Sequence, residues 1–102
     1  MKLLVKSAVW DDLREIALRI SKDNPEAADR FLTAASDAFD LLKRHPRIGR
    51  LRSFSVVGIR SWVISDFANY IVFYLPTATE VQILAVVHGA RDVSGVMAQR
   101  LK

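Results

Sequence analysis

The chain has 102 residues, of which 51% are hydrophobic and 25% charged, with a net charge of +4; we expect a single domain over residues 1–102. The absence of cysteine excludes disulfides and zinc-thiolate sites, and two histidines are too few for a multi-histidine metal site, so we expect no metal and no cofactor. No apolar run approaches the roughly 20 residues that cross a bilayer, and the start KLLVKS lacks a signal-peptide core, which predicts a cytoplasmic protein without a membrane partner.

The first 44 residues predict a strand followed by a helical hairpin. Residues 3–5 suit a short strand, and Ser7 fits the N-cap of a helix whose apolar residues recur at helical spacing from 9 to 20. The polar sequence SKDN then ends this helix. Asn24 is a second N-cap, and a longer helix should run from Pro25, at its first position, to about residue 44.

The second half of the chain predicts strands, because its apolar residues alternate with a period of two. Segments 59–64, 69–75 and 80–87 are rich in β-branched and aromatic residues and are joined by short turn-like links. They predict an antiparallel meander whose edge the first strand can join, followed by a short terminal helix within 92–101. The predicted fold class is α+β, with an N-terminal strand and a helical hairpin packed on one face of a twisted, mainly antiparallel sheet.

The positive charge is concentrated in one segment. Residues 43–60 contain no acid and six basic side chains, namely Lys43, Arg44, Arg47, Arg50, Arg52 and Arg60. Lys43 and Arg44 suit the end of a helix, and Pro46 stops it. This explanation does not extend to Arg47, Arg50 and Arg52, for which we expect an electrostatic role toward an anionic partner. An acidic protein segment, a nucleic acid and a phosphorylated substrate all fit that description.

A second group of candidate residues lies in VVHGARD, residues 86–92, at a predicted strand end. His88 is a candidate general base, although a single histidine there more often serves as a hydrogen-bonded residue. Arg91 and Asp92 either pair with each other or cap the last helix. Tyr70 and Tyr74 share one face of their strand by parity, and either hydroxyl can reach solvent from there. No serine or second carboxylate is placed to complete a catalytic triad.

The order of these features is similar to that of a known family. A short strand, a helical hairpin, HPRIGR, a strand with Ile59-Arg60, NYIVFYLP and ILAVVHGARD together resemble the RelE/ParE superfamily of bacterial type II toxin–antitoxin toxins, most closely the ParE, or plasmid-stabilisation, branch. The resemblance spans essentially the whole chain. It implies a toxin neutralised by a ParD-like antitoxin in a hetero-oligomeric complex, in which DNA is contacted only through the antitoxin. For the ParE branch it implies DNA gyrase as the target, inhibited by protein–protein binding without chemistry by the toxin.

The alternative is the RelE branch, whose members cleave mRNA on the ribosome. That branch uses several arginines and lysines with an acid–base residue near the C-terminus, whereas residues 93–97 here contain no proton-transferring group. An endoribonuclease would therefore depend on His88, Tyr70 or Tyr74 for proton transfer, and on Arg60 and Arg91 for the phosphate charge.

The favoured hypothesis is a gyrase-binding toxin with a predicted set of partner-binding residues. These are Arg47, Arg50, Arg52, Arg60 and Arg91. A plain RNA- or DNA-binding domain is a third hypothesis, and it predicts strongly salt-dependent binding.

Overall fold

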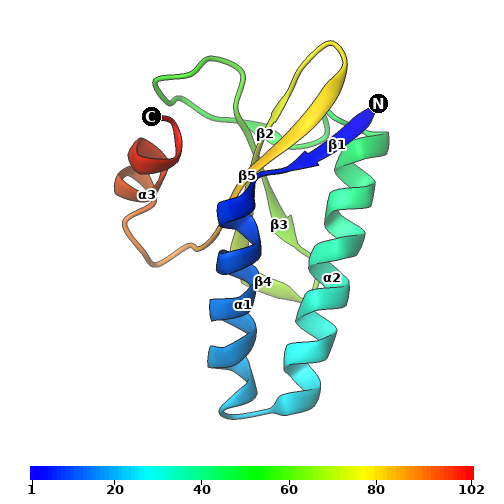
Figure 1. Ribbon diagram of the computed structural model, residues 1–102, viewed down its shortest axis with the longest axis vertical. Helices are drawn as coiled ribbons and strands as arrows, with labels where there is room; N and C mark the ends of the chain where they lie inside the picture. Colours follow the sequence, from blue (N-terminus) through cyan, green and yellow to red (C-terminus); the bar gives the residue numbers. More distant parts are fainter.

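The computed structural model describes all residues from Met1 to Lys102. It contains three helices and five strands in the order β1 (Lys2–Val5), α1 (Ser7–Ser21), α2 (Pro25–Arg44), β2 (Arg50–Leu51), β3 (Arg60–Ile64), β4 (Phe67–Pro76), β5 (Glu80–His88) and α3 (Val93–Arg100). Helices α1 and α2 lie side by side as a hairpin in front of the sheet, and α3 lies apart from them (Figure 1). The predicted α+β class, the helical hairpin and the short C-terminal helix are confirmed.

The five strands form one mixed sheet in the order β1-β5-β4-β3-β2. Strands β3, β4 and β5 are the predicted antiparallel meander, and β1 joins its edge in parallel with β5. Strand β2 was not predicted from the sequence. It pairs only two residues with β3 and lies inside the basic segment, and two residues are too short to display a period of two.

Helices α1 and α2 differ in how their N-termini are capped. Asn24 caps α2 as predicted, because its side-chain oxygen accepts a hydrogen bond from the Ala27 N–H at 3.1 Å. The predicted N-cap at Ser7 is wrong, since Ser7 is already helical and Lys6 holds the cap position without a side-chain bond. The carbonyl of Lys6 accepts from the Val9 N–H at 2.9 Å, so the first turn closes one residue earlier than predicted.

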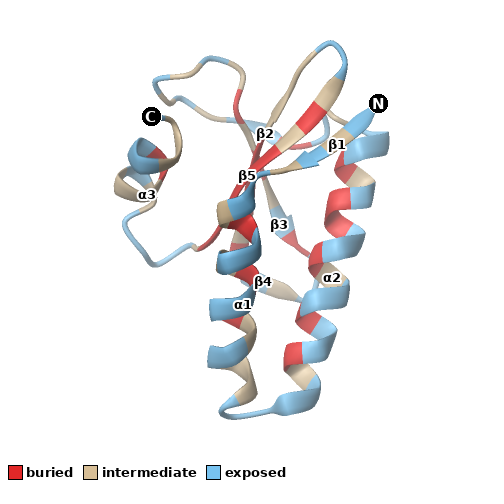
Figure 2. Ribbon diagram, viewed as in Figure 1, coloured by how far each residue is buried: buried red, intermediate tan, exposed pale blue.

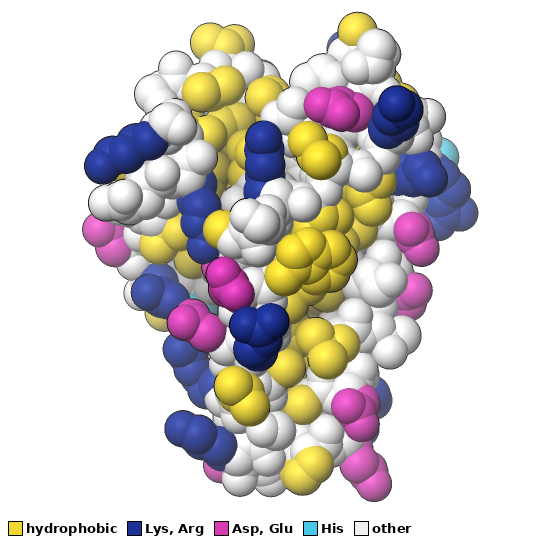
Figure 3. Space-filling view, in the orientation of Figure 1, with side chains coloured by type: hydrophobic (Ala, Val, Ile, Leu, Met, Phe, Trp, Pro, Cys, Tyr) yellow, Lys and Arg dark blue, Asp and Glu magenta, His cyan; other side chains and the backbone are white.

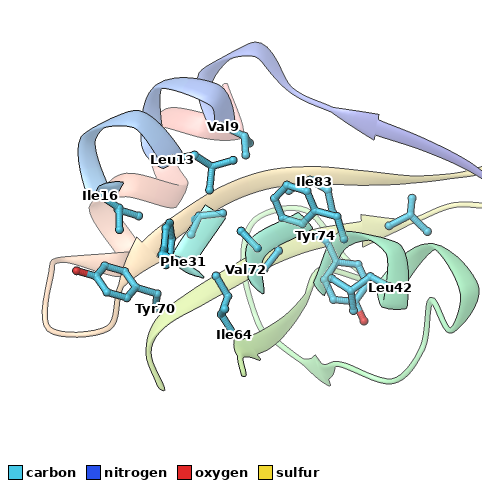
Figure 4. Packing of buried hydrophobic residues seen from close by; sticks show 14 residues of the cluster. Val9, Leu13, Ile16, Phe31, Leu42, Ile64, Tyr70, Val72, Tyr74 and Ile83 are labelled. Atoms are coloured by element: carbon cyan, nitrogen blue, oxygen red, sulfur yellow. The ribbon is translucent and has the colours of Figure 1, made fainter. Parts of the chain in front are cut away.

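Buried side chains cover both faces of the sheet. The larger cluster fills the space between the hairpin and the sheet, where Phe31 and Leu42 of α2 meet Val72 and Ile83 of the strands (Figure 4). The buried positions on α1 and α2 accordingly face the sheet (Figure 2). A smaller cluster on the opposite face consists of Ile59, Phe73, Leu84, Ala85, Val87 and Met97. Helix α3 and the segment before β3 therefore cover the face that the hairpin leaves open.

Helix α3 is attached to the body of the protein by a largely buried ion pair. Arg100 Nη1 donates to Asp12 Oδ2 at 2.8 Å and to the carbonyl oxygen of Leu84 at 3.0 Å, and Arg100 Nη2 also pairs with Asp12. The same carboxylate accepts from the Val86 N–H at 3.0 Å. The hydrogen bond to Asp12 is the main cause that raises the pKa of Arg100, against the opposing effect of burial. This arrangement joins α1, β5 and α3 at one point.

None of the three helices combines the length and the apolar composition that crossing a bilayer requires.

Candidate partner-binding surfaces

The basic loop, residues 44–52, is fixed in shape by side chains of β3 and β4. The Gly49 N–H donates to the hydroxyl oxygen of Tyr74 at 2.8 Å. On the other side, Arg60 Nη1 donates to the carbonyl oxygen of Gly49 at 2.8 Å and to that of Arg47 at 3.2 Å. The backbone at Gly49 is thus held through both its N–H and its carbonyl, at the point where the loop runs between α2 and β2.

Glycine is required at position 49 because the chain approaches its neighbours closely there. A Cβ atom on Gly49 would lie 2.5 Å from the Tyr74 hydroxyl oxygen and 2.7 Å from the carbonyl oxygen of Ser61. Both distances are shorter than van der Waals contact permits. Any side chain would therefore displace the loop from the sheet.

The Tyr74 side chain is fully buried, so the expectation that its hydroxyl can reach solvent is wrong. Burial raises the pKa of Tyr74, while the hydrogen bond from Gly49 and the positive charge of Arg60 act in the opposite direction. The phenol is therefore held in its neutral form, in which its oxygen accepts the bond from Gly49. Its role here is to hold the loop.

The arginines of the loop region differ in how many contacts their guanidinium groups make within the protein. Arg60 is half-buried, and its bonds to two carbonyls hold the loop. Arg52 donates to Ser61 Oγ at 3.2 Å, and its guanidinium lies 5.3 Å from the centre of the Phe73 ring. Arg47 and Arg50 are exposed, and the two salt bridges of the protein lie elsewhere. Their guanidinium groups are the ones most available to a partner.

Arg91 lies apart from the basic loop. It follows β5 and lines a shallow hollow with Glu15, Leu18 and Arg19 of α1 and with Lys22, the residue after that helix. The structure therefore brings together four of the five arginines predicted to bind a partner, and it leaves Arg91 at the opposite end of the sheet. Its neighbour Asp92 caps α3, since Asp92 Oδ1 accepts from the Gly95 N–H at 3.0 Å.

The residues of the alternative catalytic set are divided between the two ends of β4. Tyr70 lies opposite His88 with their ring centroids 5.1 Å apart, and His88 Nδ1 accepts from the Ala90 N–H at 3.0 Å. Arg60 instead lies opposite Tyr74, four residues further along β4, which at the strand rise is on the order of 13 Å away. The structure also contains no group of three or more acidic or histidine side chains that could hold a metal ion.

An apolar groove runs between α1 and α2 on the side away from the sheet. Its main lining residues are Trp10, Leu13, Ala17, Leu18, Leu32 and Phe39. Trp10, Leu18 and Leu32 are 53%, 59% and 41% exposed, although all three are large and apolar. Figure 3 shows hydrophobic side chains gathered along this part of the surface. Contiguous exposed apolar patches are a common feature of the surfaces through which proteins bind one another.

The groove was not predicted from the sequence, although a signal for it exists. Trp10, Ala17 and Leu18 recur at positions i, i+7 and i+8, which places them on one side of α1. This second stripe lies beside the one that faces the sheet. Such a pattern can be found by asking whether a helix carries more apolar residues than one neighbour can cover.

Comparison with known proteins assigns the family. The family model described as "ParE toxin of type II toxin-antitoxin system, parDE" matches residues 3–93. The chain belongs to the ParE toxin family. A solved structure titled "Chromosomal ParDE TA system from P. aeruginosa" aligns with a TM-score of 0.72 at 20% identity, covering 86% of this chain and 95% of that chain, so the two share a fold. No curated protein matches the chain significantly.

The ParE match includes both surfaces described above. The basic loop and the residues of the apolar groove all fall within residues 3–93. The predicted resemblance to the RelE/ParE superfamily is confirmed. A ParE-family toxin with this structure thus presents a positively charged loop with a fixed backbone and an apolar groove between two helices.

Proposed function

We propose that this ParE-family toxin inhibits DNA gyrase by protein–protein binding and is neutralised by a ParD-like antitoxin encoded beside it. The observation that carries the proposal is the occurrence of two outward-facing surfaces, the basic loop and the apolar groove, in a chain whose residues 3–93 match the ParE family. Both surfaces suit a macromolecular partner. In the proposed hetero-oligomeric complex, DNA is contacted only by the antitoxin.

The apolar groove suits an amphipathic helix of the antitoxin. Helices commonly dock through large apolar side chains at spacings of three, four and seven residues, which fit between the side chains of a groove such as this. The half-exposed Trp10 is the natural anchor, because a tryptophan contributes a large contact area at low entropic cost. Arg14 and Asp29 also line the groove and provide polar contacts at its margin.

The basic loop suits an acidic segment of the same antitoxin. Arg47 and Arg50 are exposed and have no carboxylate partner within the chain. A guanidinium group pairs with a carboxylate through two parallel hydrogen bonds. An acidic segment that is disordered before binding would order itself along these arginines. We include Arg52, Arg60 and Arg91 in the proposed partner-binding set, with Arg60 acting through the loop that it holds.

The alternative, a RelE-like mRNA endoribonuclease, has less structural support. Cleavage through the 2′-hydroxyl requires a base, an acid and a cation around one phosphate. Tyr70 is buried against the rings of Phe31 and His88, and Arg60 is engaged with the loop at the far end of β4. Only His88 and Arg91 would then remain for proton transfer and for binding the phosphate. We therefore favour inhibition by binding.

A supercoiling assay tests the proposed target. Purified toxin at increasing concentration should inhibit supercoiling of relaxed plasmid by purified gyrase, and prior addition of the antitoxin should restore it. Normal supercoiling at a large excess of folded toxin would refute the gyrase target. Primer extension on mRNA after brief induction of the toxin tests the alternative, and new transcript ends that disappear in a His88→Ala variant would favour the ribonuclease.

Co-purification tests the proposed partner. The toxin and the product of the adjacent small reading frame should elute together as a hetero-oligomer after co-expression. Separate elution of the two folded proteins would refute this antitoxin as the partner.

A further inference from the structure

The four arginines of the basic loop line two hollows that meet at Ile48. The first hollow lies between the end of α2 and the turn after β4, and it contains Arg44 and Arg47. The second lies beside β3 and contains Arg50 and Arg52. Ile48 lines both hollows, and no acidic residue lines either of them. The loop therefore presents one continuous basic surface.

Most of the guanidinium donors on this surface have no partner within the chain. Arg47 and Arg50 are exposed, and neither forms a salt bridge. Arg44 uses only Nε, which donates to the carbonyl oxygen of Asp40 at 3.3 Å, and Arg52 uses only Nη1 for a hydrogen bond. Because a guanidinium group carries five N–H donors, all four arginines keep donors for a ligand with several negative charges.

The excess positive charge of the protein is confined to this region. Of the 15 basic side chains, six lie in residues 43–60, and none of the 11 acidic side chains does, so the remainder of the chain is slightly acidic. A charge distribution of this kind attracts a polyanion to one end of the molecule.

The basic loop and the apolar groove are separate surfaces. No residue lines both the groove and either of the two basic hollows. The groove follows the hairpin of α1 and α2, whereas the loop begins where α2 ends (Figure 1). A toxin that holds a protein through the groove therefore keeps the loop free for a second, anionic partner.

We propose that the basic loop of the free toxin binds the phosphate backbone of the duplex DNA held by gyrase. The planar guanidinium group pairs with phosphate oxygens as well as with carboxylates. A duplex carries one phosphate charge about every 3.4 Å along each strand, so several arginines of the loop contact the backbone at once. Backbone contacts are independent of base sequence. This inference rests on the proposed gyrase target and adds a DNA contact to the protein contact.

The fixed shape of the loop favours a stiff ligand such as a duplex. The N–H and the carbonyl of Gly49 are bonded to Tyr74 and Arg60, so the arginines project from a backbone that is already ordered. The acidic segment proposed for the antitoxin would occupy the same arginines and exclude DNA from them. In the toxin–antitoxin complex, DNA is then contacted only by the antitoxin, and the loop reaches DNA only in the free toxin.

Fluorescence anisotropy with the free toxin and a labelled DNA duplex of mixed sequence tests the contact. If the four arginines neutralise four phosphates, the logarithm of the association constant should fall against that of the salt concentration with a slope of about −3.6. The variant Arg47→Gln/Arg50→Gln should reduce this slope by about half and weaken binding at low salt at least tenfold. Absence of duplex binding by the wild-type toxin at low salt would overturn the inference.

Arg19→Gln/Arg30→Gln is the matched control. Both arginines are exposed on the hairpin and form no salt bridge, so this variant loses the same charge without a change in the loop. It should bind the duplex within threefold of wild type, with an unchanged slope. Equal losses in the two double variants would overturn the loop as the site. An RNA duplex of the same sequence that binds at least tenfold more tightly would overturn DNA as the ligand.

Binding to gyrase separates this inference from the proposed function. Addition of the DNA duplex to gyrase should tighten binding of the wild-type toxin at least tenfold, and Arg47→Gln/Arg50→Gln should lack this gain. An equal gain in the variant, or no gain in the wild type, would overturn the DNA contact and leave gyrase as the target. If the wild-type toxin does not bind gyrase with or without DNA, the proposed target fails, and anisotropy alone decides whether the loop binds DNA.

Discussion

The basic loop and the apolar groove are held in shape by different kinds of contact. The loop depends on a few polar bonds between segments far apart in the chain, such as Gly49 to Tyr74 and Arg60 to Gly49. The groove follows from the periodicity of α1 and α2, whose packing is distributed over many side chains. A single substitution can therefore deform the loop, whereas in the groove it removes contact area and leaves the shape intact. The predictions below test this difference, from the largest expected effect to the smallest.

Gly49→Ala should deform the loop. The added Cβ would overlap the Tyr74 hydroxyl and the Ser61 carbonyl, and we expect the free energy of unfolding to fall by about 3 kcal/mol. Urea denaturation measures this loss. Gly89→Ala is the matched control, because its Cβ would meet its nearest atom at an ordinary 3.4 Å. Equal losses in the two variants would contradict the close approach at Gly49.

Trp10→Ala should damage the groove as a binding surface and leave the fold intact. Because Trp10 is half-exposed, its truncation should weaken antitoxin binding by about 2 kcal/mol and change the free energy of unfolding by less than about 1 kcal/mol. Isothermal titration calorimetry and urea denaturation give the two values. Val57→Ala, at a site that is 92% exposed and outside the groove, is the control. Unchanged antitoxin affinity in Trp10→Ala would exclude the groove as the docking site.

Tyr74→Phe should loosen the loop and change how the free energy of unfolding depends on pH in the alkaline range. Removing the acceptor of the Gly49 N–H should cost about 1.5 kcal/mol. Burial raises the pKa of Tyr74 above its ordinary value, so above pH of about 10 the unfolded chain releases a proton that the folded chain keeps. This tyrosine therefore stabilises the fold below that pH, and the stability is lost as the pH rises further.

Denaturation across alkaline pH measures this effect. The wild type should lose stability more steeply with rising pH than Tyr74→Phe, which lacks the phenol. Tyr70→Phe, which removes the hydroxyl of the other strand tyrosine, should cost less at neutral pH. Parallel alkaline profiles for wild type and Tyr74→Phe would show that the Tyr74 proton is not linked to folding.

Arg50→Gln should have the smallest effect, and one that depends on salt. Arg50 is exposed, so its loss should weaken antitoxin binding by about 0.5 kcal/mol, mainly through slower association. The difference from wild type should disappear at high ionic strength. Arg91→Gln makes the same charge change at the other end of the sheet, and we expect it to alter the association rate less. A larger effect of Arg91→Gln on the association rate would show that the electrostatic contact with the antitoxin lies near Arg91 and not at the loop.

The sequence predicted the fold because the signals for its elements are local. Helix α2 carries an N-cap, a proline at its first position and an apolar stripe, and its observed bounds match the prediction. The basic loop was recognised by its charge, but its internal bonds join residues up to 25 positions apart. No local pattern indicates that Arg60 turns inward while Arg50 turns outward, or that Tyr74 accepts a bond from Gly49. Those roles depend on the register of β3 and β4.

The parallel pairing of β1 with β5 has a consequence for how the protein is synthesised. Lys2 pairs with Glu80, and Asp12 bonds to Arg100 across 88 positions of the chain. The first strand therefore has no partner until the fifth has been made, and Asp12 of α1 has no ion-pair partner until Arg100 has been made. Contacts between such distant residues slow folding. The native sheet is therefore completed only after β5 has been translated, and a nascent chain without β5 exposes the apolar side of its hairpin.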